Sequence, residues 1–432
     1  MIRRRAIAAG AILAGTVLLS SCGLSGTGDG GQTGDGGQPK AGGEVTGKVT
    51  LQTWNLKSQF SDYIEGVIAA FEKKYPGTSV TWLDQPGDGY EEKLLTQASA
   101  GELPDVTNTT PVFSYQLAKE GLLVDLDSVD DSLKATYVPG SLAGFQFNGQ
   151  KGTYGYPWYL TTELNYWNTD TMAAGDLDAK HPPTTLDELV TQARTLKEKS
   201  GGKSFLMSNK PYVGTFTAAG IPVINEAGTE FVFNSDEAVA LLDTYREAFK
   251  EGLLPKDVLN DDFLGNTQLF TKGSVGWTTA GGNFIGTALE SNPSLKGKIT
   301  SSPYIGTPPL AVQGVSIPKS SKNLPTAKAL AQFLTNAANQ EAFAKLVPGI
   351  FPSATASQAN AAFGEGDGTP EGDARVIAFK ALTQAKVPEP VQLTGAMSTY
   401  VNQQIAAAMT GEITSKEALD SAVAKCNQLL AQ

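Results

Sequence analysis

The apolar and polar positions after residue 45 follow a strand pattern and then a helix pattern. Val49, Leu51 and Thr53 alternate with polar neighbours, and this two-residue period predicts a strand. From about Ser61 the apolar side chains recur every three or four positions as far as the Pro76-Gly77 pair. That spacing predicts an amphipathic helix, which ends where proline and glycine interrupt it.

The same alternation of strand and helix then repeats. Residues 80–83 predict a second strand, Tyr90–Ala100 a second helix and residues 103–106 the start of a third strand. Alternating strands and helices indicate an α/β fold with a mostly parallel sheet, and ligands bind such a sheet beyond the carboxyl ends of its strands. The loops after the three strands are therefore expected to meet at one edge. These loops contain Trp54, Asp84–Gln85 and Asn108–Thr110.

The second half of the chain also carries helix signals, and the length of the chain predicts two lobes. Thr185 with Glu188, and Thr414 with Glu417, have the spacing of a capping box at a helix start. Ser235 precedes a further helical stripe of apolar residues. Roughly 390 residues form the body, which is more than one hydrophobic core usually supports.

Residues 1–21 have the pattern of a lipoprotein signal peptide. Arg3–Arg5 precede an apolar run from Ala6 to Leu19, which is too short to span a bilayer as a helix and is typical of a signal sequence. Leu19–Gly23 resembles a bacterial lipobox, in which the cysteine, here Cys22, is lipidated and becomes the first mature residue. Cleavage as an ordinary secretory signal is the alternative.

Residues 22–43 are expected to form a flexible tether between that lipid anchor and the folded body. Ten of the 21 residues from Gly23 to Gly43 are glycine, and no core forms from such a composition. A tether of this length reaches on the order of 25 Å. We therefore expect the protein at the cell membrane, lipid-anchored and facing the extracellular side or the periplasm.

Net charge and rare residue types argue against several functions. The formal net charge is -11, which disfavours nucleic acid and anionic lipid surfaces as partners. His181 is the single histidine and lies in a turn-like Lys-His-Pro-Pro segment, so a histidine-based metal site or a Ser-His-Asp triad is not expected. Cys426 shares a helical apolar stripe with leucine and valine residues, which predicts a core position.

An aromatic-rich stretch is a candidate for ligand contact. The fourteen residues from Tyr154 to Trp167 contain six aromatic side chains, and Pro157 keeps the chain extended. Alternate side chains of an extended run face opposite sides, so one side can pack in a core while the other meets a ligand. Aromatic faces beside Thr161 and Asn165 suit a flat, hydroxyl-rich molecule such as a sugar. A buried strand whose aromatic side chains only pack is the alternative.

Six segments, taken in order, resemble one family. Tyr90–Val106 (YEEKLLTQASAGELPDV) resembles the Y-x-x-K-L…G-x-x-P-D-V stretch of bacterial extracellular solute-binding proteins of the carbohydrate-binding, maltose-binding-protein-like type. Five further segments resemble that family in the same order: Gly155–Asp170, Phe270–Gly281, Gln313–Lys319 with the helix after it, Ile350–Ser353 and Met409–Leu430. The resemblance covers nearly all of Glu44–Gln432.

The resemblance implies two discontinuous α/β lobes joined by hinge strands, each lobe a mostly parallel sheet flanked by helices. The ligand is expected in the cleft between the lobes. The expected crossings between lobes lie near Thr162–Leu164, Pro309–Val312 and Phe351–Ala354. The expected lobe boundaries are 44–162 and 311–352 for lobe 1, and 163–310 and 353–432 for lobe 2.

The resemblance also places a set of polar and aromatic residues at the ligand. They are Trp54, Asn55, Gln85, Asn108, Thr109, Trp158, Tyr159, Thr161, Asn283, Phe284, Gln313 and Phe351. Family members often carry tryptophan where this chain has Asn283 and Val315, so the residues that stack on the ligand are not given by the resemblance. Trp54 and Tyr159 are the expected ones, with packing in the core as the alternative. Asp105 is expected either to contact ligand or to cap a loop, and Trp277 is expected in the core.

The implied function is that of the substrate-binding lipoprotein of an ABC importer. A mono- or oligosaccharide closes the two lobes around itself, and the protein, a monomer, delivers it to the membrane permease subunits. Catalytic residues, cofactors and metal ions are not implied, and the protein is not expected to be an enzyme. Three alternatives remain: a binding protein for a non-sugar solute such as a peptide or polyamine, a glycoside hydrolase that uses two of the 44 acidic residues, and a purely structural lipoprotein.

Overall fold

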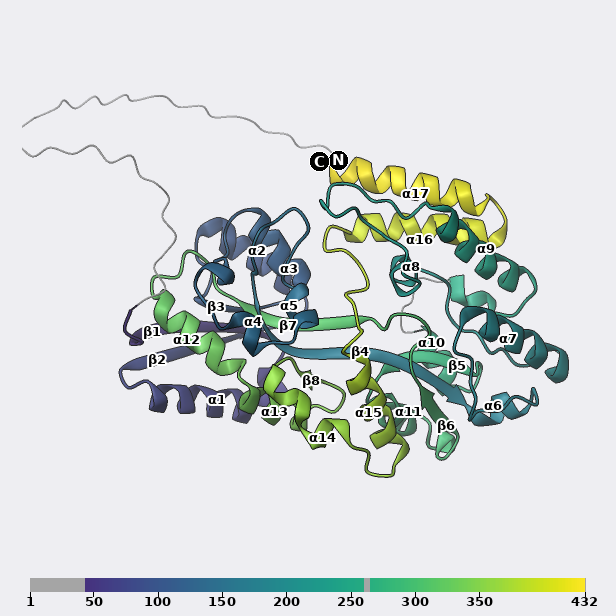
Figure 1. Cartoon of the computed structure of the whole chain (residues 1–432), viewed down its shortest axis with the longest axis horizontal. Coiled ribbons are helices and arrows are strands. Elements are labelled where there is room, and N and C mark those ends of the chain that lie inside the picture. Colours follow the sequence, from purple (N-terminus) through teal and green to yellow (C-terminus); the bar gives the residue numbers. More distant parts are fainter. Residues whose placement is uncertain (1–42, 260–264, 432) are drawn as a thin grey trace, which may run out of the picture. The chain divides into compact units, whose positions relative to one another are not determined.

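Three strands near the start of the body form a parallel sheet, as the alternating pattern predicts. In the computed structural model, β1 (Gly47–Trp54) pairs in parallel with β2 (Thr78–Gln85) along its whole length and with β3 (Val106–Thr109) near its middle. Figure 1 shows α1 (Lys57–Lys74) on one side of this sheet and α2 (Tyr90–Ala100) on the other.

The structure describes residues 43–259 and 265–431, which belong to the unit Pro39–Gln432. The predicted signal peptide 1–21, the predicted lipidation site Cys22 and the predicted tether as far as residue 42 lie outside the described residues. Among the helices of the described part, none is long and apolar enough to cross a membrane.

The other strand pairs are antiparallel. β7 (Leu310–Ser316) runs against β3 and against the first half of β4 (Tyr156–Asn168). The remaining partners of β4 are also antiparallel: β5 (Trp277–Gly281), β6 (Ile299–Ser302) and β8 (Phe351–Pro352). Parallel pairing of named strands is therefore confined to β1–β3, a correction to the mostly parallel sheets expected in both lobes. The reason is that the regular strand–helix alternation behind that expectation ends at β3.

Strand β4 changes partners in its middle. Thr162 pairs with Leu310 of β7, whereas Glu163 pairs with Gly281 of β5. The strand order is β2-β1-β3-β7-β4-β5, with β6 and β8 also paired to β4. In Figure 1, β4 accordingly runs from the part of the molecule around β1–β3 into the part around β5 and β6.

Two large clusters of buried apolar side chains pack beside β4. Tyr166 belongs to the cluster that also contains Leu51 and Phe71, whereas its neighbour Trp167 belongs to the cluster that contains Cys426. Successive side chains on a strand face opposite sides, so this one strand contributes to both cores. The complete burial of Cys426 confirms its predicted core position.

Helices cover both parts. Beyond α1 and α2 they are α3 (Pro111–Lys119), α4 (Leu133–Thr136), α5 (Pro139–Ala143), α6 (Thr169–Ala173), α7 (Leu186–Ser200), α8 (Val213–Ala218), α9 (Asp236–Lys250), α10 (Gly265–Thr271), α11 (Phe284–Ser291), α12 (Leu324–Leu334), α13 (Ala337–Leu346), α14 (Ala361–Gly364), α15 (Pro370–Ala381), α16 (Gly395–Thr410) and α17 (Ser415–Leu430). Helix α2 has the predicted bounds, and it ends because Gly101 adopts a positive φ of 70°.

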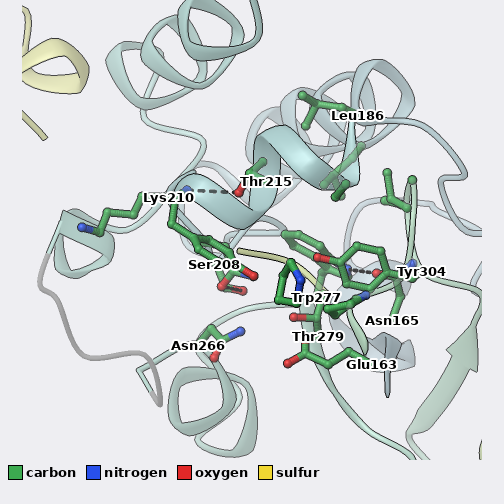
Figure 2. Close-up of a pocket in the computed structure, with 18 of the residues that line it drawn as sticks. Glu163, Asn165, Leu186, Ser208, Lys210, Thr215, Asn266, Trp277, Thr279 and Tyr304 are labelled. Carbon is green, nitrogen blue, oxygen red and sulfur yellow. Dashed lines mark hydrogen bonds between the residues drawn. The ribbon is translucent and has the colours of Figure 1, made fainter. Parts of the chain in front are cut away.

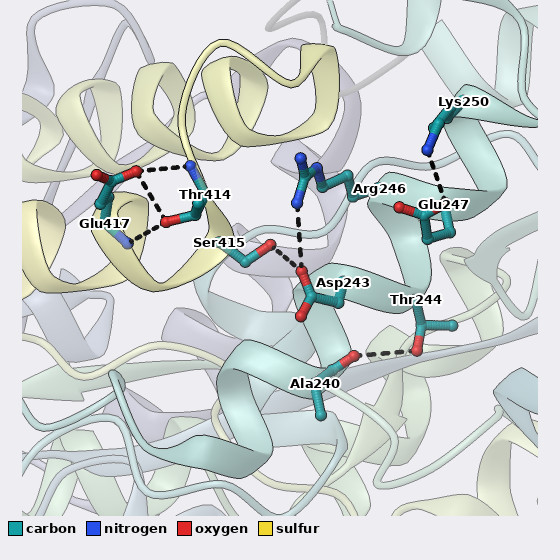
Figure 3. Close-up of polar contacts among 9 residues, drawn as sticks. All are labelled: Ala240, Asp243, Thr244, Arg246, Glu247, Lys250, Thr414, Ser415 and Glu417. Atoms are coloured by element: carbon teal, nitrogen blue, oxygen red, sulfur yellow. Dashed lines mark hydrogen bonds and ion pairs between the residues drawn. The ribbon is translucent and has the colours of Figure 1, made fainter.

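The predicted helix caps form, with one difference. Figure 3 shows the Thr414 hydroxyl and the Glu417 carboxylate in a complete capping box at the start of α17. At α7 the Thr185 hydroxyl accepts from the Glu188 N–H as predicted, but the Glu188 carboxylate binds Thr184 instead. The Ser415 hydroxyl also donates to Asp243 at 2.6 Å, which joins α17 to α9 (Figure 3).

Candidate ligand-binding site

A cavity of about 1120 Å³ lies beside the point where β4 changes partners. Figure 2 shows side chains from several separate segments converging on it. The segments that line it include Thr161–Glu163 of β4, Ser208–Lys210, Tyr304–Gly306, Pro309–Ala311 and Pro388–Glu389. Its size is ample for a small organic ligand.

Strand β4 supplies one wall through the two-residue period of its side chains. Thr161, Glu163 and Asn165 are alternate residues, so they face the same side, and all three line the cavity. Asn165 is fully buried, and both the nitrogen and the oxygen of its side-chain amide form hydrogen bonds. Its Nδ2 donates to the Pro303 carbonyl at 2.5 Å, and its Oδ1 accepts from the Trp277 indole at 3.0 Å. Asn165 thereby fixes the orientation of Trp277, which also lines the cavity.

A second wall comes from the segment before α8. Backbone N–H groups of Gly276 and Trp277 donate to Phe205 and Leu206 at 2.8 and 3.0 Å, which holds this segment extended beside β5. The extended segment delivers Ser208 and the residues after it to the cavity. The chain then turns at Pro211 into the short helix α8.

Tyr212 occupies the turn between these two elements. Its backbone N–H donates to the Thr215 hydroxyl at 3.1 Å, which ties it to the first turn of α8. A Cβ atom added at Gly214 would lie 2.5 Å from Cε2 of the Tyr212 ring. Only glycine at position 214 therefore allows this ring its place against the helix.

Two carboxylates share the cavity with the tyrosines. Burial raises the pKa of Glu163 and of Glu389, and a hydrogen bond from Thr279 or from the Gly214 N–H offsets part of the effect in each case. Burial, and then the charges of both carboxylates, raise the pKa of Tyr212 above its usual range. Tyr212 therefore lies close to both acids and keeps its hydroxyl proton as a donor.

Aromatic rings complete the lining. Tyr304, whose pKa burial raises well above its usual range, lines the cavity with Tyr212, Tyr245 and Trp277. Flat rings interspersed with hydroxyl, amide and carboxylate groups can hold a molecule that has both apolar faces and many hydrogen-bonding groups. Within the described residues there is no cluster of histidine, cysteine and acidic side chains that could hold a metal ion.

One of the predicted ligand residues lines this cavity, and several others gather at the ends of β1–β3. Thr161 is the one in the cavity. Trp54 is half-buried, with its ring 4.8 Å from that of Tyr90 and 5.3 Å from that of Phe113. Gln85 pairs with Trp54 across the sheet, and Asn55 follows, exposed, with a positive φ of 53°.

Asn108 and Gln313 meet at the same end of the sheet. The Asn108 amide donates to the Gly314 carbonyl at 2.8 Å and contacts the Gln313 side chain at 3.4 Å. Thr109 is fully buried, and its hydroxyl bonds with Ser316 at 2.8 Å. The structure thus brings the loops after β1, β2 and β3 together, while ligand contact by these residues stays a prediction.

The remaining predicted residues lie among other aromatic side chains. Trp158 is fully buried and stacks on Phe343 with ring centroids 5.4 Å apart. Tyr159 is half-buried, and its ring centroid lies 5.5 Å from that of Phe343. Phe351 packs 5.6 Å from Phe379. Phe284 is buried, and its ring centroid lies 4.9 Å from that of Tyr166. Asn283 is exposed. Trp158, Phe284 and Phe351 belong to the cluster of buried apolar side chains that also contains Leu51, and ligand contact by these five residues stays a prediction.

Asp105 has a clear structural role. Its carboxylate accepts from the Thr50 backbone N–H and hydroxyl, both at 2.8 Å, and from the Ser321 hydroxyl at 2.7 Å. These bonds tie the start of β3 to β1. Loop capping, one of its two expected roles, accounts for every one of these contacts.

The sequence reading missed Glu163, Tyr212, Tyr304 and Glu389. A signal for Tyr212 was available, because Phe205–Met207 is an apolar run followed directly by polar residues and Pro211-Tyr212. That is the strand-then-polar-loop pattern which singled out Trp54 and Asn108. Glu389 had no such signal, since it lies in an irregular segment that reaches the cavity only through the tertiary fold.

A two-lobed binding protein is the class that this fold and cavity define, and comparison with known proteins supports it. The family model "Bacterial extracellular solute-binding protein" matches residues 54–341. The chain belongs to this family, as its six sequence segments predicted.

Relatives with assigned ligands are distant in sequence. The diacetylchitobiose-binding protein DasA of Streptomyces coelicolor is 23% identical over 299 residues, which cover 68% of this chain and 67% of that protein. The melibiose/raffinose/stachyose-binding protein MelE of Bacillus subtilis is 25% identical over 325 residues, which cover 69% and 73%. A binding protein of Brucella abortus is 24% identical over 278 residues, and the match spans 62% of this chain and 66% of that relative.

Solved structures share the fold over nearly the whole body. A periplasmic-binding protein from Synechococcus sp. MITs9220, assigned to oligosaccharides, has a TM-score of 0.78 and 26% identity, covering 89% of this chain and 99% of that one. The cyclic alpha-maltosyl-1,6-maltose binding protein from Arthrobacter globiformis has a TM-score of 0.74 and 19% identity, covering 90% and 99%. The predicted two-lobed α/β fold is confirmed.

Proposed function

We propose that this protein is the sugar-binding component of an ABC importer. The observation that carries the proposal is the cavity of about 1120 Å³, which Tyr212, Tyr304 and Trp277 line beside polar groups. The faces of a sugar ring gain dispersion and burial against aromatic rings, while its hydroxyls need donors and acceptors. The sugar specificities assigned to DasA and MelE support the same ligand class.

Capture is proposed to occur by closure of two lobes around the sugar. The partner switch of β4 between Thr162 and Glu163 supports the predicted boundaries, with 44–162 and 311–352 in lobe 1 and 163–310 and 353–432 in lobe 2. A ligand that contacts both lobes stabilises the closed state over the open one. Trp54 and its neighbours at the ends of β1–β3 would then meet the sugar from the side opposite Tyr212.

The cellular setting of this function follows from the N-terminal region. We propose that Cys22 is lipidated, that residues 22–43 tether the body outside the cell membrane, and that the loaded monomer docks on membrane permease subunits. The lipobox-like Leu19–Gly23 and the glycine content of the tether support the anchor. Family membership supports an extracellular location.

Two other functions would use the same cavity differently. A glycoside hydrolase needs two carboxylates roughly 5–10 Å apart on either side of the scissile bond, and Glu163 and Glu389 are the two half-buried acids of the lining. Membership in a solute-binding family supports binding without catalysis. A binding protein for a peptide or polyamine would share the fold and differ only in ligand.

A thermal-shift screen of the mature protein against mono- and oligosaccharides, followed by calorimetry of the hits, tests the proposal. We expect at least one saccharide to raise the melting temperature and to bind without being cleaved. Tyr212→Ala should weaken that binding, whereas Tyr400→Ala, which removes a half-buried ring outside the cavity lining, should not. Binding of peptides or polyamines in place of every saccharide would contradict the proposal, and release of free sugar would indicate a hydrolase.

A further inference from the structure

The two half-buried carboxylates of the cavity lining have hydrogen-bond donors but no charged partner among the described residues. Glu163 interacts with the Thr279 hydroxyl, and Glu389 with the Gly214 backbone N–H. The ion pairs formed within the described part of the chain include neither acid. Both acids therefore face the cavity without a cation that would balance them.

The cationic side chains of the lining lie elsewhere on it. They are Lys210 and Lys272. Lys272 is exposed and follows the last residue of α10, and Figure 2 shows the Lys210 side chain extending away from Glu163. Asp257, the third acid of the lining, is also exposed. Glu163 and Glu389 are half-buried whereas Lys272 and Asp257 are exposed, so these two other charges of the lining are more accessible to solvent than the two glutamates.

Tyrosines line the same cavity as the acids. Tyr212 lies close enough to both carboxylates for their charges to affect it, and Tyr304 lies close to Glu163. A half-buried carboxylate without a counter-charge loses part of its hydration, which is unfavourable. A cation would relieve this cost, and the electron-rich faces of nearby aromatic rings attract cations as well. The hydroxyls of a neutral sugar can donate hydrogen bonds but supply no charge.

We propose that the sugar which this cavity binds carries a protonated amino group, and that Glu163 and Glu389 receive it. This inference rests on the proposed sugar-binding function and narrows it to amino sugars. The ammonium group would bring three N–H donors and one positive charge to two acids, while the rest of the sugar ring packs on the tyrosines.

Calorimetry with matched sets of saccharides tests the proposal on the whole mature protein. One set is glucosamine, N-acetylglucosamine and glucose; a second is chitobiose, diacetylchitobiose and cellobiose. Each set keeps the ring and changes only the group at carbon 2 from ammonium to acetamide to hydroxyl. We expect the ammonium member to bind at least about tenfold more tightly than the hydroxyl member, since a hydrogen bond to a charged group is worth more than a neutral one.

Variants assign the preference to the two acids. Glu163→Gln and Glu389→Gln keep side-chain size and remove charge, so each should reduce the preference for the ammonium member. Glu290→Gln, at an exposed position on α11, should leave it unchanged. An ammonium preference that survives in both cavity variants would overturn the assignment to these residues.

The other outcomes are distinct. If hydroxyl or acetamide members of any set bind as tightly as the ammonium member, the amino-sugar inference is wrong while the sugar-binding function stands. If no saccharide binds but a linear diamine such as putrescine does, both the inference and the proposed function are wrong.

Discussion

The indole N–H of Trp277 donates to the Asn165 amide oxygen at 3.0 Å, across the neighbouring strands β5 and β4. Both side chains are buried and both line the cavity. This bond joins the core to the site, because it satisfies a buried donor and orients a ring of the lining.

Replacing Asn165 with leucine tests that relationship. The variant leaves the buried Trp277 N–H without its partner, and an unsatisfied buried polar group costs about 1–3 kcal/mol. We expect urea denaturation to show a loss of that order, together with weaker sugar binding. Gln59→Ala, at an exposed position on α1, should change neither. An unaltered free energy of unfolding for Asn165→Leu would show that the bond is not formed.

Trp54 and Trp158 should respond differently to truncation. Trp54 is half-buried at the end of β1, so Trp54→Ala should weaken sugar binding roughly ten- to a hundredfold with little effect on the melting temperature of the apo protein. Trp158 is fully buried against Phe343, so Trp158→Ala should lower the free energy of unfolding by about 3–5 kcal/mol. A large loss of stability in Trp54→Ala with normal affinity would assign Trp54 to the core. The same measurements of sugar affinity and stability on Tyr159→Ala show whether Tyr159 contacts the ligand or packs in the core.

The pH dependence of stability should reveal the two acids of the cavity lining. Burial raises the pKa of Glu163 and Glu389 in the folded state above the ordinary value of 4.5, so the folded protein binds protons more readily than the unfolded chain. Stability should therefore fall as the pH rises from about 4.5 through these raised values. Glu163→Gln and Glu389→Gln should melt at higher temperature than wild type at pH 7, and the difference should vanish below pH 4.5. Variants less stable than wild type at pH 7 would show that the charged carboxylates stabilise the fold.

Closure of the lobes should be visible in solution. Saturation with a sugar that binds by calorimetry should reduce the radius of gyration measured by small-angle X-ray scattering, because contacts from both lobes favour the closed state. The control is the same protein in the same buffer without sugar. An unchanged radius of gyration with a saturating ligand would count against closure.

The anchor can be tested on the secreted protein. Mass spectrometry of the mature wild type should show Cys22 as the first residue, carrying acyl chains. Cys22→Ala should leave the precursor unlipidated and uncleaved at this position. Cleavage at another position, with no acyl chains on the mature protein, would contradict the lipoprotein hypothesis and indicate an ordinary secreted protein.

Local pattern was enough to predict much of this protein. The alternation of Val49 and Leu51 predicts β1, and the positions of Tyr90 and Gly101 bound α2 correctly, because period and capping are properties of neighbouring residues. The order of six family-like segments predicted family and fold, which each segment alone would not have done. Burial of Cys426 followed from its helical stripe.

Only the tertiary structure decided which aromatic and acidic side chains share one cavity. Tyr166 and Trp167 look equivalent in the sequence, yet they belong to different cores, because β4 passes between two bodies of packed side chains. Glu163 and Glu389 are far apart in the chain, and both act on Tyr212. Burial and charge depend on which distant segments pack together, whereas a local period reports only which side of its own element a residue occupies.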